Sequence, residues 1–355
     1  MSETIKLEPT HAPPPTAVDE RLARVSFLTK LLQRPELGAL LGAAAVLVFF
    51  AVTADRFGTL SGMARWTDVA STIGIMAVAV ALLMIGGEFD LSAGVMTGTT
   101  GLLMGILATE VGMSLWLAIL LTFAFAAGIG FMNGYMVIRT GLPSFIVTLA
   151  TFFILQGVNL GGTKAITDTV RVGGLSEASG FESAQRIFAS DFWAPHNFRI
   201  SLVWWIAITI LATWVLSRTR VGNWIFGVGG DKVAARNVGV PVNRVKIGLF
   251  MITSMAAALV GIMVALRLGS VQAGQGIGEE FTYIIAAVAG GCLLTGGFGS
   301  AIGAAAGALI IGMTFIGIQF SGWNTDWRFL FLGVILLAAV LVNTYVRRRA
   351  EGARS

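Results

Sequence analysis

Long apolar stretches alternate with short polar connections along most of the chain. A helix needs about 20 mainly apolar residues to cross a bilayer core of roughly 30 Å, and ten stretches come near that length. They cover residues 37–53, 69–85, 91–108, 115–138, 145–160, 200–216, 247–266, 281–295, 301–320 and 329–346. Lipid offers no partner to backbone N–H and C=O groups, so such spans have to be helical. The pattern predicts an all-α polytopic membrane protein with about ten transmembrane helices.

Composition agrees with a membrane protein, because 55% of the 355 residues are hydrophobic and only 12% are charged. The 45 glycines and 8 prolines also fit, since both residues are commoner in membrane helices than in soluble ones. The single cysteine, Cys292, excludes a disulfide within one chain. The two histidines, His11 and His196, lack the spacing of a metal site. We therefore expect neither a metal nor a cofactor.

Lysines and arginines gather beside the apolar stretches, as they do on the cytoplasmic flanks of membrane helices. The net charge of +5 therefore does not indicate nucleic-acid binding. If the N-terminus lies inside, roughly twice as many basic residues fall inside as outside. This bias predicts that the N- and C-termini are both cytoplasmic.

Three regions follow from this topology. Residues 1–36 are polar and are expected to form a cytoplasmic tail, because a signal peptide would begin its apolar core much earlier. The second half of this tail, residues 21–34, is typical of an amphipathic helix at the membrane interface. Residues 37–346 form the predicted transmembrane domain, and a basic cytoplasmic tail follows at 347–355.

Two connections are longer than the others. The predicted outer loop, residues 161–199, contains "FESAQRIFASDFW", which predicts a short amphipathic helix lying on the membrane. The predicted inner loop, residues 217–246, is basic and contains "GGDKVAARNVGVP" at 229–241. Here Asp231 can cap a helix, Gly239 suits the left-handed position after it, and Pro241 prevents its continuation. A helix this short needs a partner surface for stability.

Two carboxylates, Glu88 and Asp90, interrupt the apolar text between two predicted spans in "MIGGEFDLSAGVMTG". In one interpretation Asp90 and Ser92 only cap the helix that follows. In the other, Gly86 and Gly87 break the backbone, and the carboxylates face a central pathway, as in the discontinuous helices of transporters. The sequence leaves both interpretations open.

Further polar groups lie on or beside apolar stretches. Gln156 and Asn159 share a helix face at a spacing of three, which suits either hydrogen bonds between helices or contact with a polyhydroxylated substrate. Glu279 and Glu280 follow a glycine-rich outer loop and are either contacts for an external partner or solvated acids. Small residues in 290–312 predict close helix packing, and this segment weakly echoes 86–105.

Several motifs are absent from the sequence. No phosphate-binding G-x-x-x-x-G-K-[ST] loop occurs, so this chain is not expected to hydrolyse ATP itself. No arrangement of nucleophile, base or metal ligands suggests an enzyme. The spans also lack the chain of buried ionisable residues that proton-coupled carriers use.

Several segments together resemble the permease subunit of bacterial sugar ABC importers of the ribose/xylose type. They are "FGTLSGM" (57–63), "GGEFDLSAG" (86–94), "NGYMVIRTGLPSFIVTLAT" (133–151), "AARNVGVPVNRVKI" (234–247), "GIGEEFTYIIAAVAGGCLLTGGFGS" (276–300) and "FLGVILLAAVLVN" (331–343). The chain departs from the family pattern at Glu88, where a glycine is usual, and in "GEEF", where "GYEL" is usual.

The resemblance implies a passive gate in the bacterial cytoplasmic membrane, surrounded by lipid, that passes a sugar by alternating access. Its implied partners are a cytoplasmic ABC ATPase, an external sugar-binding protein, and a second copy of the permease or a related one. Helix 229–241 would dock on the ATPase, and Glu279 and Glu280 would contact the binding protein. The coupling residues are Asp231, Val233, Ala234, Ala235, Arg236, Asn237 and Gly239, and the pathway residues are Glu88, Asp90, Ser92, Gln156 and Asn159.

The main alternative is a stand-alone ion-coupled transporter or channel for a small polar solute. Its driving ion would need acids within the membrane, and Glu88 and Asp90 are the candidates. A membrane-embedded enzyme is disfavoured by the missing catalytic arrangements.

Overall fold

The computed structural model describes residues 35–352. The predicted N-terminal tail up to residue 34, with its amphipathic helix at 21–34, and residues 353–355 lie outside the described part. The helices are α2 (Pro35–Thr53), α3 (Leu60–Ile85), α4 (Ala93–Thr109), α5 (Leu115–Thr140), α6 (Ser144–Thr167), η2 (Leu175–Glu177), α7 (Phe181–Phe188), α8 (Ser201–Arg218), α9 (Arg220–Gly230), α10 (Lys232–Asn237), α11 (Val242–Leu268), α12 (Glu279–Ala289), α13 (Ala301–Phe320) and α14 (Trp327–Gly352).

Most predicted spans are long apolar helices, so the all-α polytopic fold is confirmed. Within the described residues, seven helices are long and apolar enough to cross a membrane: α2, α3, α5, α6, α8, α11 and α13. Two shorter apolar helices join them, α4 and the first part of α14 (Trp327–Val342). The helical backbone of α14 continues to Gly352, into the predicted C-terminal tail. The number of ten spans and their orientation stay predictions.

One predicted span, 281–295, is wrong as a continuous helix. Helix α12 has 11 residues, which corresponds to about 16 Å, only half of a bilayer core of roughly 30 Å. It ends because the N–H of Gly290 turns back to the carbonyls of Ala286 and Val288, and Gly291 takes a left-handed φ of 90°. The hydropathy pattern continues through this turn, and the sequence signal for the break is the pair Gly290 and Gly291.

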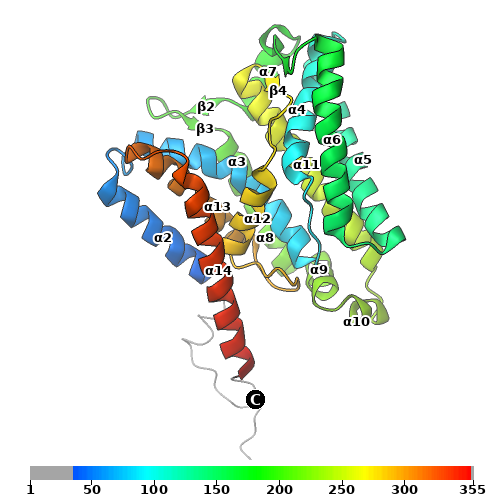
Figure 1. Cartoon of the computed structure of the whole chain (residues 1–355), viewed down its shortest axis with the longest axis vertical. Coiled ribbons are helices and arrows are strands. Elements are labelled where there is room, and N and C mark those ends of the chain that lie inside the picture. The colour runs from blue at the N-terminus through cyan, green and yellow to red at the C-terminus, as the bar shows by residue number, and fades with distance from the viewer. Residues whose placement is uncertain (1–34, 353–355) are drawn as a thin grey trace, which may run out of the picture.

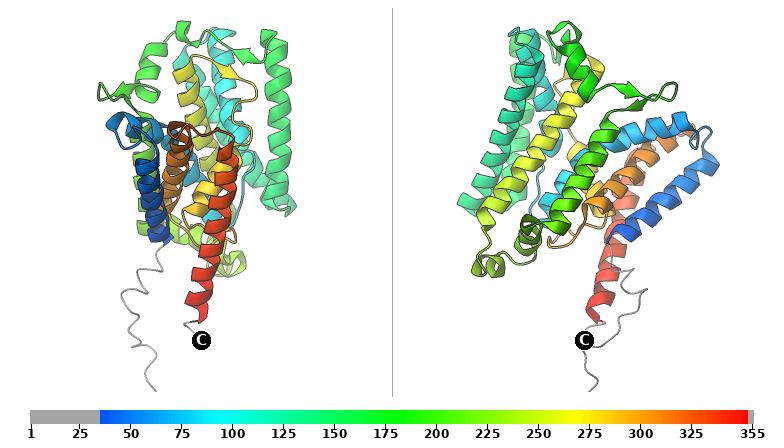
Figure 2. Two further views of the ribbon diagram at one scale, coloured as in Figure 1. Left: turned by 60° about the vertical axis from the view of Figure 1, so that its left-hand side comes forward. Right: turned by 180° about the vertical axis from the view of Figure 1, so that it is seen from behind.

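The helices form a buried centre and an exposed periphery. In their most apolar stretches, 83% of residues are buried in α3 and 78% in α13, against 17% in α2 and 22% in α8. Helices α4, α5, α6 and α11 stand together on one side of the molecule, and α2, α13 and α14 lie on the other (Figure 1). Helix α3 runs obliquely between the two groups, and α8 packs along it when the molecule is seen from behind (Figure 2).

Four two-residue strands add to the predicted all-α architecture. Strand β1 (Arg171–Val172) pairs antiparallel with β4 (Val271–Gln272), and β2 (Asp191–Phe192) pairs antiparallel with β3 (Phe198–Arg199). All four lie in connections between helices, at the end of the molecule opposite α10 (Figure 1). The β1–β4 pair joins the predicted outer loop to the connection after α11, whereas β2 and β3 pair with each other inside that loop.

The amphipathic helix predicted in the outer loop is α7. Its apolar residues Phe181, Ala184 and Phe188 are buried, while Glu182 and Arg186 are exposed. This face packs against α11 and α5, so protein rather than lipid covers it.

The small residues after 290 also pack closely as expected, since a Cβ on Gly307 would lie 1.9 Å from the carbonyl oxygen of Ala286 in α12.

Candidate functional site

The chain between α3 and α4 is an unwound segment buried inside the molecule. Helix α3 ends at Gly86, whose N–H donates to the carbonyls of Leu82 and Met84, and Gly87 takes a left-handed φ of 81°. The chain then runs without helical hydrogen bonding until α4 begins at Ala93 (Figure 1). The predicted backbone break at Gly86 and Gly87 is therefore confirmed.

Asp90 begins a chain of hydrogen bonds that joins this segment to α5 and α6. Its Oδ1 accepts from the backbone N–H of Ser92 at 2.8 Å and from the Ser92 hydroxyl at 2.5 Å. The Nδ2 of Asn133 donates to the same hydroxyl at 3.2 Å, and the Thr151 hydroxyl donates to Asn133 Oδ1 at 2.6 Å. These residues are buried. Asp90 thus anchors α4 to its neighbours. The capping interpretation is wrong, because Ser92 is the residue before α4 and its side chain makes no capping hydrogen bond.

Helix α6 also satisfies backbone groups that the unwound segment leaves free. The N–H of Phe89 donates to the hydroxyl of Ser144, and the N–H of Leu91 donates to the hydroxyl of Thr148, both at 3.0 Å. A non-helical backbone at membrane depth requires such partners. Sequence analysis missed these hydroxyls, although Ser144, Thr148 and Thr151 recur at the spacing of one helix face.

Gln156 and Asn159 lie farther along α6 than the unwound segment. From Thr151 to Asn159 the helix rises about 12 Å. Asn159 is buried, and within the described residues its Nδ2 has no hydrogen-bond partner. Gln156 is half-buried. The structure therefore brings Glu88, Asp90 and Ser92 together in one segment and leaves the two amides apart from it.

Glu88 forms an ion pair with Lys246 near the start of α11. Both side chains are nearly buried, with 9% of Glu88 and 12% of Lys246 exposed. From the sequence, Lys246 is expected to be a cytoplasmic flanking charge and Glu88 a residue of the pathway. In the structure, their ion pair joins the unwound segment after α3 to the start of α11.

Residues 229–241 form the predicted capped helix, α10. The Oδ1 of Asp231 accepts from the N–H groups of Val233 at 2.8 Å and Ala234 at 3.0 Å. These two hydrogen bonds favour the ionised carboxylate and lower the pKa of Asp231. At the other end, Gly239 takes a left-handed φ of 84°, and Pro241 precedes α11. The predicted start and stop of this helix are confirmed.

Most side chains of this helix are exposed at one end of the molecule. Ala235 is buried and packs toward α9, whereas Ala234, Arg236 and Asn237 are exposed. The valines on either side of them are exposed too, at 61% for Val233 and 80% for Val238. Docking of this helix on a partner stays a prediction.

Glu279 and Glu280 open helix α12. Glu280 is buried, and its Oε2 accepts from the N–H of Gly278 at 3.0 Å. Glu280 therefore has a partner inside its own chain, while Glu279 is half-buried. Contact of either residue with a binding protein stays a prediction.

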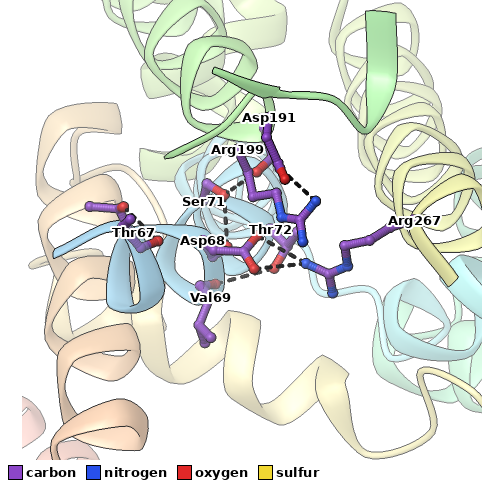
Figure 3. A network of polar contacts seen from close by, with 10 residues as sticks. Thr67, Asp68, Val69, Ser71, Thr72, Asp191, Arg199 and Arg267 are labelled. Atoms are coloured by element: carbon purple, nitrogen blue, oxygen red, sulfur yellow. Dashed lines mark hydrogen bonds and ion pairs between the residues drawn. The ribbon is translucent and has the colours of Figure 1, made fainter. Parts of the chain in front are cut away.

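A second polar network lies between α3, α8, α11 and the β2–β3 hairpin (Figure 3). The Nη1 of Arg267 donates to both carboxylate oxygens of Asp68 at 2.9 Å. Arg199 pairs with Asp191 across the hairpin at 2.6 Å. The small cavity beside these residues has room for about one water molecule. We interpret this network as a structural tie between helices rather than a ligand site.

No group of three or more His, Cys, Asp or Glu residues that could hold a metal lies within residues 35–352. Cys292 is buried and unpaired by disulfide. The candidate functional features of the described residues are the hydrogen-bonded polar side chains, the unwound segment after α3 and the exposed short helix α10.

Comparisons with known proteins fit this arrangement. The family model described as "Branched-chain amino acid transport system / permease component" matches residues 62–340. The ribose import permease protein of Escherichia coli strain K12 is 31% identical over 308 residues, covering 84% of this chain and 91% of the relative. The galactose/methyl galactoside import permease protein of the same strain is 31% identical over 343 residues, covering 92% and 99%.

The fructose import permease protein of Rhizobium meliloti is 28% identical over 306 residues, covering 86% of this chain and 84% of the relative. No solved structure matches the chain. The resemblance to permeases of sugar importers is thus confirmed. Since the family model covers most of the chain, the protein belongs to this family of transport-system permease components, and it is a multi-pass membrane transporter subunit rather than an enzyme.

Proposed function

We propose that this chain is the membrane subunit of an ATP-driven ABC importer that brings a sugar into a bacterial cell. Relatives that cover most of its length are import permeases for ribose, galactose and fructose. A monosaccharide is therefore the proposed substrate. The protein would lie in the cytoplasmic membrane, with a second copy or a related permease, an external binding protein and a cytoplasmic ATPase.

Helix α10 is the observation that carries this proposal. It is a capped helix of six residues with exposed valines, outside the long apolar helices. A helix of this length has little stability of its own in water, so a partner surface is its expected complement. The start of α2 and the end of α14 lie at the same end of the molecule as α10 (Figure 2). If that end is cytoplasmic, α10 faces the ATPase.

The proposed mechanism is a rigid-body switch between two states. ATP binding closes the ATPase subunits, and α10 moves with them. The helices then open the pathway alternately to each side of the membrane, and the binding protein delivers the sugar from outside. Glu88, Asp90, Ser92, Gln156 and Asn159 remain the proposed pathway residues, reached when the helices separate.

A stand-alone ion-coupled transporter is the second candidate. The observation that favours it is Asp90, whose Oδ2 is buried and has no partner within the described residues. Intramembrane acids of this kind often serve as ion sites. Glu88 fits this role less well because Lys246 already neutralises it.

Uptake measurements separate the two candidates. In a host strain deleted for this gene and complemented with the full chain, uptake of radiolabelled D-ribose, D-galactose, D-fructose and D-xylose is compared. Depletion of ATP should abolish uptake of the substrate sugar, and an uncoupler that spares ATP should leave it intact. Uptake that survives ATP depletion and follows the proton gradient would instead establish the second candidate.

Replacing Arg236 and Asn237 together by alanine tests the docking surface directly. Both are exposed on α10, so the double variant should insert normally but lose sugar uptake and ATPase stimulation. Normal values of both, at a normal level of membrane insertion, would show that α10 does not couple the subunits.

A further inference from the structure

The turn that ends α3, residues 85–88, contacts the segment that contains α10 at two separate points. We call this segment, residues 229–246, the coupling segment. The first contact lies just before α10 in the sequence, and the second lies just after it, at the start of α11. Neither contact could be read from the sequence, since the partners are more than 140 residues apart.

The first contact is backbone against backbone. Gly229, at the end of α9, lies so close to α3 that a Cβ on it would be 1.7 Å from the carbonyl oxygen of Ile85. The N–H of Gly297, from the loop after α12, donates to the same carbonyl oxygen at 2.8 Å. Only Gly230 and the capping residue Asp231 separate Gly229 from α10. A shift of α10 therefore pushes directly on the end of α3.

The second contact is the ion pair between Lys246 and Glu88. Lys246 lies in the first turns of α11, which begins directly after Pro241. Because both side chains are nearly buried, separating them would leave an uncompensated charge in a region of low dielectric. The ion pair therefore holds Glu88 to the base of α11 and resists separation.

Beyond Glu88 the chain leads directly into the unwound segment. Phe89 and Leu91 are bonded to hydroxyls of α6, and Asp90 is bonded to the first residue before α4. Movement of the turn is thus passed in two directions, into α3 and into α4.

We propose that turn 85–88 is the receiver of coupling-helix motion, with Gly229 and the Glu88–Lys246 ion pair as its two attachment points. This inference rests on the proposed ABC importer function. Glu88 and Lys246 then act as positioning residues for transport, since they transmit movement and need not touch the sugar. Because residues 85–88 are attached on both flanks of α10, a displacement of α10 also displaces residues 85–88.

Two glycine variants test the first attachment. Gly229→Ala places a methyl group against Ile85, whereas Gly230→Ala meets no atom within 4 Å and serves as the matched control. In reconstituted vesicles with the ATPase and binding protein, Gly229→Ala should lower the sugar transported per ATP, and Gly230→Ala should not. Equal values for both variants and the wild type would remove Gly229 from the coupling route.

Two double variants test the second attachment without leaving a buried charge alone. Glu88→Gln with Lys246→Gln should keep ATP hydrolysis but lower the sugar transported per ATP by about fivefold or more, because the attachment is weakened. Glu88→Lys with Lys246→Glu should restore at least part of the ratio. Asp191→Asn with Arg199→Gln removes an exposed ion pair on the β2–β3 hairpin and should leave the ratio unchanged.

The wild-type protein separates this inference from the proposed function. If wild-type transport does not depend on ATP, the importer function itself fails. If wild-type transport depends on ATP and the neutral double variant at Glu88 and Lys246 keeps the wild-type ratio of sugar to ATP, the receiver role of the turn is overturned.

Discussion

A single carboxylate organises the start of helix α10. Asp231 is exposed, yet its Oδ1 accepts two backbone N–H groups that would otherwise lack partners at the first turn of α10. The same hydrogen bonds lower the pKa of Asp231. Because the folded-state pKa is below that of an unfolded chain, the cap contributes fully above the ordinary pKa and is lost as pH falls through the lowered one.

The cap predicts a difference between two substitutions. Asp231→Ala removes the acceptor and should weaken ATPase stimulation several-fold, whereas Asp231→Asn keeps an acceptor and should retain most of it. In the wild type, protonation of Asp231 should not reduce ATPase stimulation above about pH 5, which is well above the ordinary aspartate pKa. Both expectations are checked by measuring ATPase stimulation in nanodiscs between pH 5 and 8. Equal losses in both variants would contradict a capping role.

At the scale of elements, the unwound segment depends on helices that are distant in sequence. Asn133 of α5 is buried and bridges Ser92 to Thr151 of α6 through its two polar atoms. Without Asn133, the buried chain loses two hydrogen bonds, although the Ser92 hydroxyl still donates to Asp90 and the Thr151 hydroxyl still donates to the carbonyl of Val147. The local sequence indicated the break at Gly86 and Gly87, but nothing in it indicated which helices would satisfy the freed groups.

Asn133→Leu should therefore lower the stability of the folded protein by about 1–3 kcal/mol, the usual net contribution of two intramolecular hydrogen bonds. Asn159→Leu is the matched control, because the Nδ2 of Asn159 is buried without a partner in the described structure. That substitution should leave stability unchanged or raise it. Thermal unfolding of the purified full chain in detergent compares them, and equal losses would refute the difference.

At the scale of the whole molecule, α10 and the outer loop lie at opposite ends (Figure 1). The positive-inside bias predicts that α10 faces the cytoplasm. If the whole protein were inserted in the opposite orientation, every contact within the fold would be the same, but α10 would lie on the outer side of the membrane. Orientation is therefore a property that the fold alone does not decide.

Two single-cysteine variants measure orientation. Val233 on α10 and Ser176 in the outer loop are both exposed, while the native Cys292 is buried. In intact spheroplasts, an impermeant thiol reagent should label Ser176→Cys and should label Val233→Cys only after permeabilisation. Labelling of Val233→Cys from outside would invert the topology and exclude docking of α10 on a cytoplasmic ATPase.

The sequence by itself determined what depends on neighbouring residues, namely the apolar helices and the capped helix at α10, and it offered the break after α3 as one of two interpretations. Tertiary structure decided the rest. It paired Glu88 with Lys246, joined Asp90 to Asn133 through Ser92, shortened α12, and buried α3 while leaving α2 exposed. The physical reason is range, because caps, turns and hydropathy act over a few residues. In a chain this apolar, hydropathy does not distinguish a helix that faces protein from one that faces lipid.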